Sequence, residues 1–77
     1  MSETQPPVDL SDLLPGLPPI IAREKVEEYL GGVISVGRLR NLDSQGEGPR
    51  RIRIGRKIAY RTRDLLEWLA ARAETQA

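Results

Sequence analysis

The sequence predicts a small α+β domain in which two helices, a β-hairpin and a third helix follow one another along the chain. Two stretches with helical apolar spacing flank a pair of glycines, and a later stretch alternates basic and apolar residues with the period of a strand. With 77 residues the chain forms one domain at most. We assign residues 20–74 to this domain and residues 1–19 to a flexible, proline-rich N-terminal arm.

The arm holds five of the six prolines, each of which removes a backbone donor and restricts the residue before it. Its apolar residues leave two alternatives open. They cover part of the core as a loose tail, or they form a short docked turn or a partner-binding segment. These residues are Val8, Leu10, Leu13, Leu14 and Leu17.

The first helix is predicted over residues 22–30, because its apolar residues recur at i, i+4, i+7 and i+8. These are Ala22, Val26, Tyr29 and Leu30. The charged residues between them are predicted to face water as a solvated helix face, namely Arg23, Glu24, Lys25, Glu27 and Glu28. Glycine favours the left-handed conformation of a helix C-terminus, so we expect Gly31 and Gly32 to end this helix in a sharp turn.

The second helix is predicted to begin after Ser35, whose hydroxyl can cap it, and to run to about Asp43. On a helical wheel Leu39 and Leu42 lie on one side, which we assign to the core. The opposite side presents Gly37, Arg40 and Asn41, with Val36 and Arg38 at its margins.

A loop over residues 44–49 precedes a predicted hairpin with strands over residues 51–54 and 57–61. If Ile52 and Ile54 point inward together with Ile58 and Tyr60, Ile54 lies opposite Ile58. This register requires a three-residue tip, Gly55-Arg56-Lys57, and it leaves the arginines of the first strand on the outer face.

The last helix is predicted to be capped by Thr62, with Asp64 in its first turn. Leu65, Leu66, Trp68 and Leu69 supply its buried side. The chain lacks Phe and has a single Trp, so we expect Tyr29, Tyr60 and Trp68 to be the bulky members of the core.

Composition argues against several classes of function. Without Cys or His the chain has no thiolate, no imidazole and no ordinary acid–base group near neutral pH, so we expect neither a metal, a cofactor nor a small-molecule substrate, and no enzyme activity. No apolar run approaches the roughly 20 residues that cross a bilayer, and the N-terminus lacks a secretion pattern. We therefore expect a cytoplasmic protein without a membrane partner.

The net charge of +1 conceals a strong segregation of charge along the chain. Residues 1–34 carry a charge of −4, residues 35–63 a charge of +7 and residues 64–77 a charge of −2. A basic centre between acidic flanks is typical of a domain with one face for a polyanion.

The second helix and the hairpin together form a candidate DNA-binding surface. Arginine can donate two hydrogen bonds to guanine and asparagine can pair with adenine, so Arg40 and Asn41 are the candidates for base contacts. Gly37 costs the helix about 1 kcal/mol relative to alanine, which is tolerable if it permits close approach to a duplex. The recognition set is Ser35, Val36, Gly37, Arg38, Arg40 and Asn41, and the phosphate-binding set is Arg51, Arg53, Arg56, Lys57 and Arg61.

Four segments of the chain carry a resemblance to a known family: Val26-Glu27-Glu28-Tyr29-Leu30-Gly31, Ile34-Ser35 through Leu42, Arg53-Ile54-Gly55-Arg56-Lys57-Ile58 and Asp64-Leu65-Leu66-Glu67-Trp68-Leu69. On these segments, residues 20–73 resemble the excisionase and AlpA-type prophage-regulator helix-turn-helix family, a minimal relative of MerR-type winged domains. The resemblance implies a winged helix-turn-helix fold, with the second helix in the major groove and the hairpin as a wing on the adjacent minor groove or backbone.

Three features depart from that family's pattern. The glycine turn is longer by about two residues (Gly32 and Val33), Ala22 stands where a capping Thr or Ser is common, and Val36-Gly37 replaces a polar pair. Val36 and Gly37 affect the expected base preference, since the valine side chain can touch a thymine methyl group but cannot form a hydrogen bond.

The leading hypothesis is sequence-specific binding of double-stranded DNA, either as an excisionase-like factor in phage or mobile-element recombination or as a transcriptional regulator. A protein this small contacts few base pairs, so we expect repeated half-sites bound with a recombinase or a second copy. The alternative is a protein-interaction module on a winged-helix scaffold, docking a partner through Val36, Gly37 and the arm. Single-stranded RNA binding is disfavoured because the three aromatic residues are assigned to the core.

Overall fold

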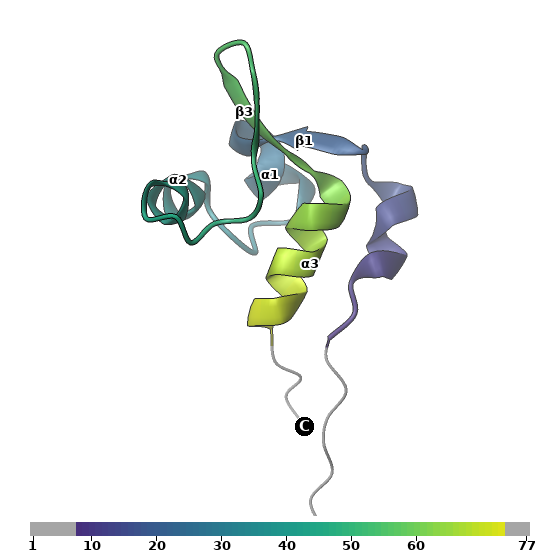
Figure 1. Ribbon diagram of the computed structural model, residues 1–77. Helices are drawn as coiled ribbons and strands as arrows, with labels where there is room; N and C mark the ends of the chain where they lie inside the picture. Colours follow the sequence, from purple (N-terminus) through teal and green to yellow (C-terminus); the bar gives the residue numbers. More distant parts are fainter. Residues whose placement is uncertain (1–7, 74–77) are drawn as a thin grey trace, which may run out of the picture.

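The computed structural model describes residues 8–73, and these residues have the predicted α+β class. A three-stranded antiparallel sheet with strand order β1-β3-β2 is joined to helices that pack beneath it (Figure 1). The elements in chain order are the 3₁₀ helix η1 (Ser11–Gly16), β1 (Ile20–Ala22), α1 (Arg23–Tyr29), α2 (Val36–Ser44), β2 (Ile52–Ile54), β3 (Lys57–Arg61) and α3 (Thr62–Arg72).

The turn between α1 and α2 follows the prediction closely. Gly31 and Gly32 both have positive φ, 66° and 83°, a conformation that side chains with a Cβ rarely adopt. The Gly32 amide donates to the carbonyl of Glu27 at 2.8 Å and the Gly31 amide to that of Glu28 at 3.3 Å, the two bonds of a Schellman motif. After the turn, the Ser35 hydroxyl oxygen accepts a hydrogen bond from the Arg38 amide at 3.1 Å, which confirms Ser35 as the N-cap of α2.

Two elements, β1 and η1, were not predicted. In β1 the side chain of Ile21 is buried opposite Tyr60 of β3, and η1 lies against α3 (Figure 1). A three-residue strand is too short for alternation to indicate it, and prolines precede it. The described part of the arm is thus a docked turn, while residues 1–7 of the predicted arm lie outside the described residues.

The predicted role of Thr62 as a helix cap is wrong. Arg61 occupies the N-cap position of α3, and Thr62 is its first residue, buried and facing the proline segment. Its amide donates to the Pro19 carbonyl at 2.9 Å and its hydroxyl donates to the Pro18 carbonyl. Thr62 therefore ties the chain before β1 to the start of α3. The predicted position of Asp64 in the first turn is confirmed.

The predicted hairpin register is also wrong. Ile54 lies opposite Lys57, Arg53 opposite Ile58, and the turn has two residues, Gly55 and Arg56. Gly55 has φ 62°, the positive value that the first central position of a type II′ turn requires, so the glycine selects the shorter turn. Paired residues point to the same face of a sheet, so Ile52 and Ile54 lie on the outer face and Arg53 shares the inner face with Ile58. The side chain of Ile54 is 54% exposed.

One buried cluster joins the sheet to all three α-helices. Its members are Ile21, Val26, Ile34, Leu39, Leu42, Tyr60 and Leu65, and Leu30, Ile58, Trp68 and Leu69 pack against it. Leu39 and Leu42 are therefore on the core side of α2, as the helical wheel predicts.

Of the three aromatic residues assigned to the core, only Tyr60 is buried there completely. Tyr29 is 48% exposed, and Trp68 lies at the edge of the core. The Trp68 indole donates to the Glu47 carbonyl at 3.0 Å, and the Arg72 guanidinium lies 4.7 Å from the ring centroid. Trp68 thus packs α3 against the loop that leads from α2 to β2.

Asp43, at the end of α2, has a buried carboxylate that bonds side chains of two other elements. Nothing in the sequence predicted this role. Asp43 Oδ2 accepts a hydrogen bond from the Tyr60 hydroxyl at 2.5 Å and forms an ion pair with Arg23 Nη1 at 2.9 Å. Arg23, which was predicted to face water, has a side chain only 21% exposed because it turns inward to Asp43. One carboxylate therefore connects α1, α2 and β3.

We predict that Tyr60→Phe destabilises the fold by about 1 to 3 kcal/mol near neutral pH, because a buried charged acceptor loses a donor. Burial raises the pKa of the Tyr60 hydroxyl above its ordinary value of 10.0, and the hydrogen bond to Asp43 and the charge of Asp43 raise it further. The unfolded chain therefore releases this proton first, so the stabilisation is present below about pH 10 and declines as the pH rises above it.

Urea denaturation of both proteins across this pH range tests the prediction. The Tyr60→Phe variant should show the lower stability near neutral pH and a shallower decline at alkaline pH. Tyr29→Phe is the matched control, since Tyr29 is half exposed and has no hydrogen bond within the described residues. Equal stability of Tyr60→Phe and the parent protein would contradict the role of Asp43 as a junction.

Candidate nucleic-acid interface

The outer side of α2 is open to solvent along most of its length. Gly37, Arg38, Arg40 and Asn41 are exposed and Val36 is half-buried, as the helical wheel predicts. A Cβ built on Gly37 meets no atom within 4 Å, so packing within the described residues does not require glycine at this position. The side chains of Arg40 and Asn41 have no hydrogen-bond or ion-pair partner within residues 8–73.

The N-terminus of α2 is held by two side chains. Ser35, itself exposed, caps the helix through its hydroxyl, and Glu27 of α1 accepts a hydrogen bond from the Val36 amide at 3.1 Å. Glu27 was predicted only to face water. This carboxylate fixes the start of α2 against α1 and lies at the positive end of the helix dipole.

A carboxylate on α1 links α2 to the hairpin electrostatically. Glu24 pairs with Lys57 of β3, although both side chains remain more than half exposed. The hydrogen bond from Lys57 holds the carboxyl pKa of Glu24 below its ordinary value of 4.5, and the charges of Lys57, Lys25 and Arg40 lower it further. Arg40 of α2 and Lys57 of the hairpin therefore lie near the same carboxylate.

The corrected register places the arginines of β2 differently from the prediction. Arg53 lies opposite Ile58 on the sheet face that also carries Tyr60, whose hydroxyl reaches Asp43 of α2. Arg51 donates to the Asp43 carbonyl at 3.4 Å, and Arg53 donates to the Gly55 carbonyl at 3.1 Å. Arg53 thus lies on the face of the sheet that looks toward α2, and Arg51, directly before β2, bonds α2 itself, although both side chains remain exposed.

The remaining basic residues of the hairpin do not share that face. Lys57 is paired in register with Ile54, and Arg61 with Ile20, on the outer face of the sheet, while Arg56 lies in the turn. The predicted phosphate-binding set is therefore divided between both faces and the tip. Arg56 and Arg61 are exposed and have no ion-pair partner within the described range.

The groups gathered here can bind an anionic polymer through hydrogen-bond donors and positive charge. They include guanidinium and amide donors on a helix beside a hairpin with cations on both faces, and both parts lie in the segment of charge +7. Within residues 8–73 no cluster of three His, Cys, Asp or Glu side chains is placed to hold a metal ion. No described helix has the length and apolarity needed to cross a bilayer.

Comparisons of the chain with protein-family models, with curated proteins and with solved structures found no match.

We predict that Lys57→Gln raises the carboxyl pKa of Glu24 toward its ordinary value, because the substitution removes the leading cause of the shift. A pH titration followed through the Glu24 side-chain carbon by NMR measures this directly. Arg56→Gln, which removes a neighbouring cation at the tip, serves as the control and should leave Glu24 nearly unchanged. A Glu24 pKa that does not respond to Lys57→Gln would contradict the pairing across α1 and the hairpin.

Proposed function

We propose that this chain binds double-stranded DNA in a sequence-specific manner through a winged helix-turn-helix arrangement. In this proposal α2 enters the major groove and the hairpin formed by β2 and β3 acts as the wing. The proposal rests on the exposure of Gly37, Arg40 and Asn41 along the outer side of α2. Their side chains make no packing, hydrogen-bond or ion-pair contact that the fold within residues 8–73 requires. Arg40 would read guanine and Asn41 would read adenine.

The division of the hairpin's cations supports contacts with the two strands of a duplex. A hairpin that lies along a groove has a phosphate backbone on each side, and Arg53 on one face with Arg61 on the other matches that geometry. Lys57, on the same face as Arg61, pairs with Glu24 in the free protein and would exchange this partner for a phosphate. Arg56, at the tip, would reach furthest into the groove or along the backbone. These contacts add affinity without reading sequence, and each neutralised phosphate adds about 0.9 to the magnitude of the salt slope.

The resemblance to excisionases and AlpA-type prophage regulators supports a role in the prokaryotic cytoplasm, bound to the nucleoid. The protein would act as an excisionase-like factor in DNA recombination or as a transcriptional regulator of a phage or mobile element. A surface of this size covers few base pairs. The protein would therefore bind repeated half-sites, either as cooperative copies or beside a recombinase.

We predict that Arg40→Ala lowers the discrimination between selected and unselected duplexes by about 1 to 3 kcal/mol, as expected for loss of a bidentate base contact. Arg56→Ala should instead weaken binding to all duplexes alike and reduce the salt slope by about 1. The cognate duplex is first obtained by selection from a random pool, and affinities are then measured by fluorescence anisotropy from about 50 to 200 mM salt.

Lys25→Ala is the control, because it removes one exposed cation from α1, outside the basic segment. It should leave discrimination unchanged. If Arg56→Ala relaxes sequence preference while Arg40→Ala does not, the roles of α2 and the hairpin are reversed. A chain that selects no duplex and forms a salt-insensitive protein complex instead would favour the alternative, a protein-interaction module without DNA binding.

We predict opposite effects of Gly37→Ala on stability and on DNA affinity. The new methyl group meets no atom within 4 Å among residues 8–73, so alanine should stabilise the α2 helix by about 1 kcal/mol. The same methyl group should weaken duplex binding if the DNA approaches α2 closely at this point. Thermal denaturation and anisotropy titration of one protein sample give both results.

Gly16→Ala is a matched control, since a Cβ at Gly16 also meets no atom of the described residues within 4 Å and lies outside the proposed DNA surface. It should leave duplex affinity unchanged. A Gly37→Ala variant that is more stable and binds DNA as well as the parent would show that the duplex does not approach that side of α2.

A further inference from the structure

Glu24, in the first turn of α1, places a negative charge beside both parts of the candidate nucleic-acid interface. Lys57 of the hairpin donates a hydrogen bond to its carboxylate and forms an ion pair with it. Arg40 of α2 lies close enough for its positive charge to help lower the carboxyl pKa of Glu24. A surface suited to a polyanion therefore contains a carboxylate at the place where its two sets of cations come near one another.

The glutamates of α1 differ in what they hold together. Glu27 accepts a hydrogen bond from the start of α2, and Glu28 lies 3.8 Å from Lys25 on the same helix. The pair of Glu24 and Lys57 instead joins two elements through side chains that are both more than half exposed. An exposed ion pair adds little to stability, because water screens both charges. Lys57 can therefore exchange Glu24 for another anion at little cost to the fold.

A phosphate bound to Lys57 would lie beside the Glu24 carboxylate, and like charges at this separation repel one another. The repulsion is offset where Arg40 donates to a guanine, because the guanidinium then needs no phosphate and still balances the charge of Glu24. On a sequence without that guanine, Arg40 has only phosphates to bind, and the carboxylate opposes this contact as well. A group that weakens the wrong complexes more than the right one raises specificity.

We propose that Glu24 is a specificity-determining residue, whose carboxylate competes with phosphates for Lys57 and Arg40 and so disfavours complexes that lack base contacts. This inference rests on the proposed binding of DNA through α2 and the hairpin. It gives a role in recognition to a side chain that the sequence predicted only to face water.

The test is Glu24→Gln, which removes the charge and keeps a side chain that can still accept the hydrogen bond from Lys57. Affinities of the full chain are measured by fluorescence anisotropy for the selected duplex and for an unselected duplex of equal length and base composition. Glu24→Gln should bind the unselected duplex at least about fivefold more tightly than the parent protein does. It should bind the selected duplex less than about twofold more tightly, so that discrimination falls.

Linear inorganic polyphosphate tests the competition separately, because it carries phosphates without bases. Glu24→Gln should bind it at least about fivefold more tightly than the parent. Glu67→Gln is the matched control, since it makes the same change of net charge at an exposed glutamate on α3. It should alter the affinity for polyphosphate and for either duplex by less than about twofold. Circular dichroism checks that both variants are folded.

The inference is overturned if Glu24→Gln binds the unselected duplex and polyphosphate no more tightly than Glu67→Gln does. It is also overturned if Glu24→Gln weakens binding of the selected duplex alone, because Glu24 would then accept a hydrogen bond from a base. Both outcomes leave DNA binding intact. If neither the parent nor Glu24→Gln binds any duplex, the proposed function itself fails, and the role of Glu24 in specificity fails with it.

Discussion

The buried carboxylate of Asp43 is the constraint on which the arrangement of α2 depends. A charge removed from water is tolerated only with close partners, and Asp43 has them in Arg23 of α1 and Tyr60 of β3. Both partners bond the same oxygen, Oδ2, while Oδ1 lies against Gly48, where a Cβ would come within 2.0 Å of it. A small residue is therefore required at Gly48, and any rotation of α2 that exposes Arg40 differently would separate this carboxylate from its partners.

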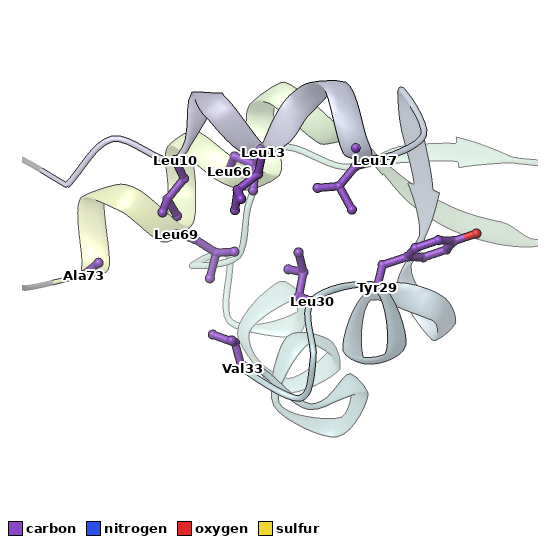
Figure 2. A pocket seen from close by; sticks show the side chains of 10 residues that line it. Leu10, Leu13, Leu17, Tyr29, Leu30, Val33, Leu66, Leu69 and Ala73 are labelled. Carbon is purple, nitrogen blue, oxygen red and sulfur yellow. The ribbon is translucent and has the colours of Figure 1, made fainter.

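The two ends of helix α1 contribute to two different surfaces. Its first turn carries Glu24, which lies near Arg40 and Lys57, whereas its last turn carries Tyr29, which lines an apolar groove together with η1 and α3 (Figure 2). The middle, basic segment of the chain supplies α2 and the hairpin, while the flanking segments supply the apolar groove.

Local signals in the sequence predicted the helices well, and long-range contacts explain what they missed. Glycine chemistry and a capping serine act over a few residues, so the turn at Gly31 and Gly32 and the start of α2 could be predicted. Arg23 turns inward because it pairs with a carboxylate 20 residues away, and the Thr62 hydroxyl is held by a carbonyl 44 residues away. The periodicity of a short segment cannot predict such distant partners. The predicted hairpin register was wrong because it followed the rule that isoleucines face the core. In the folded protein the preference of Gly55 for a two-residue turn sets the register instead.

The loop between α2 and β2 explains how the two parts of the candidate interface keep a fixed spacing. The Glu47 amide donates to the Leu42 carbonyl at 2.8 Å, Trp68 holds the Glu47 carbonyl, and Gly48 packs against Asp43. Arg51 then bonds the Asp43 carbonyl as the chain enters the hairpin. Because these contacts are formed in the free protein, a duplex that engages both α2 and the hairpin would not have to order the loop between them. Such preorganisation reduces the entropic cost of binding, which matters most for a surface with few contacts.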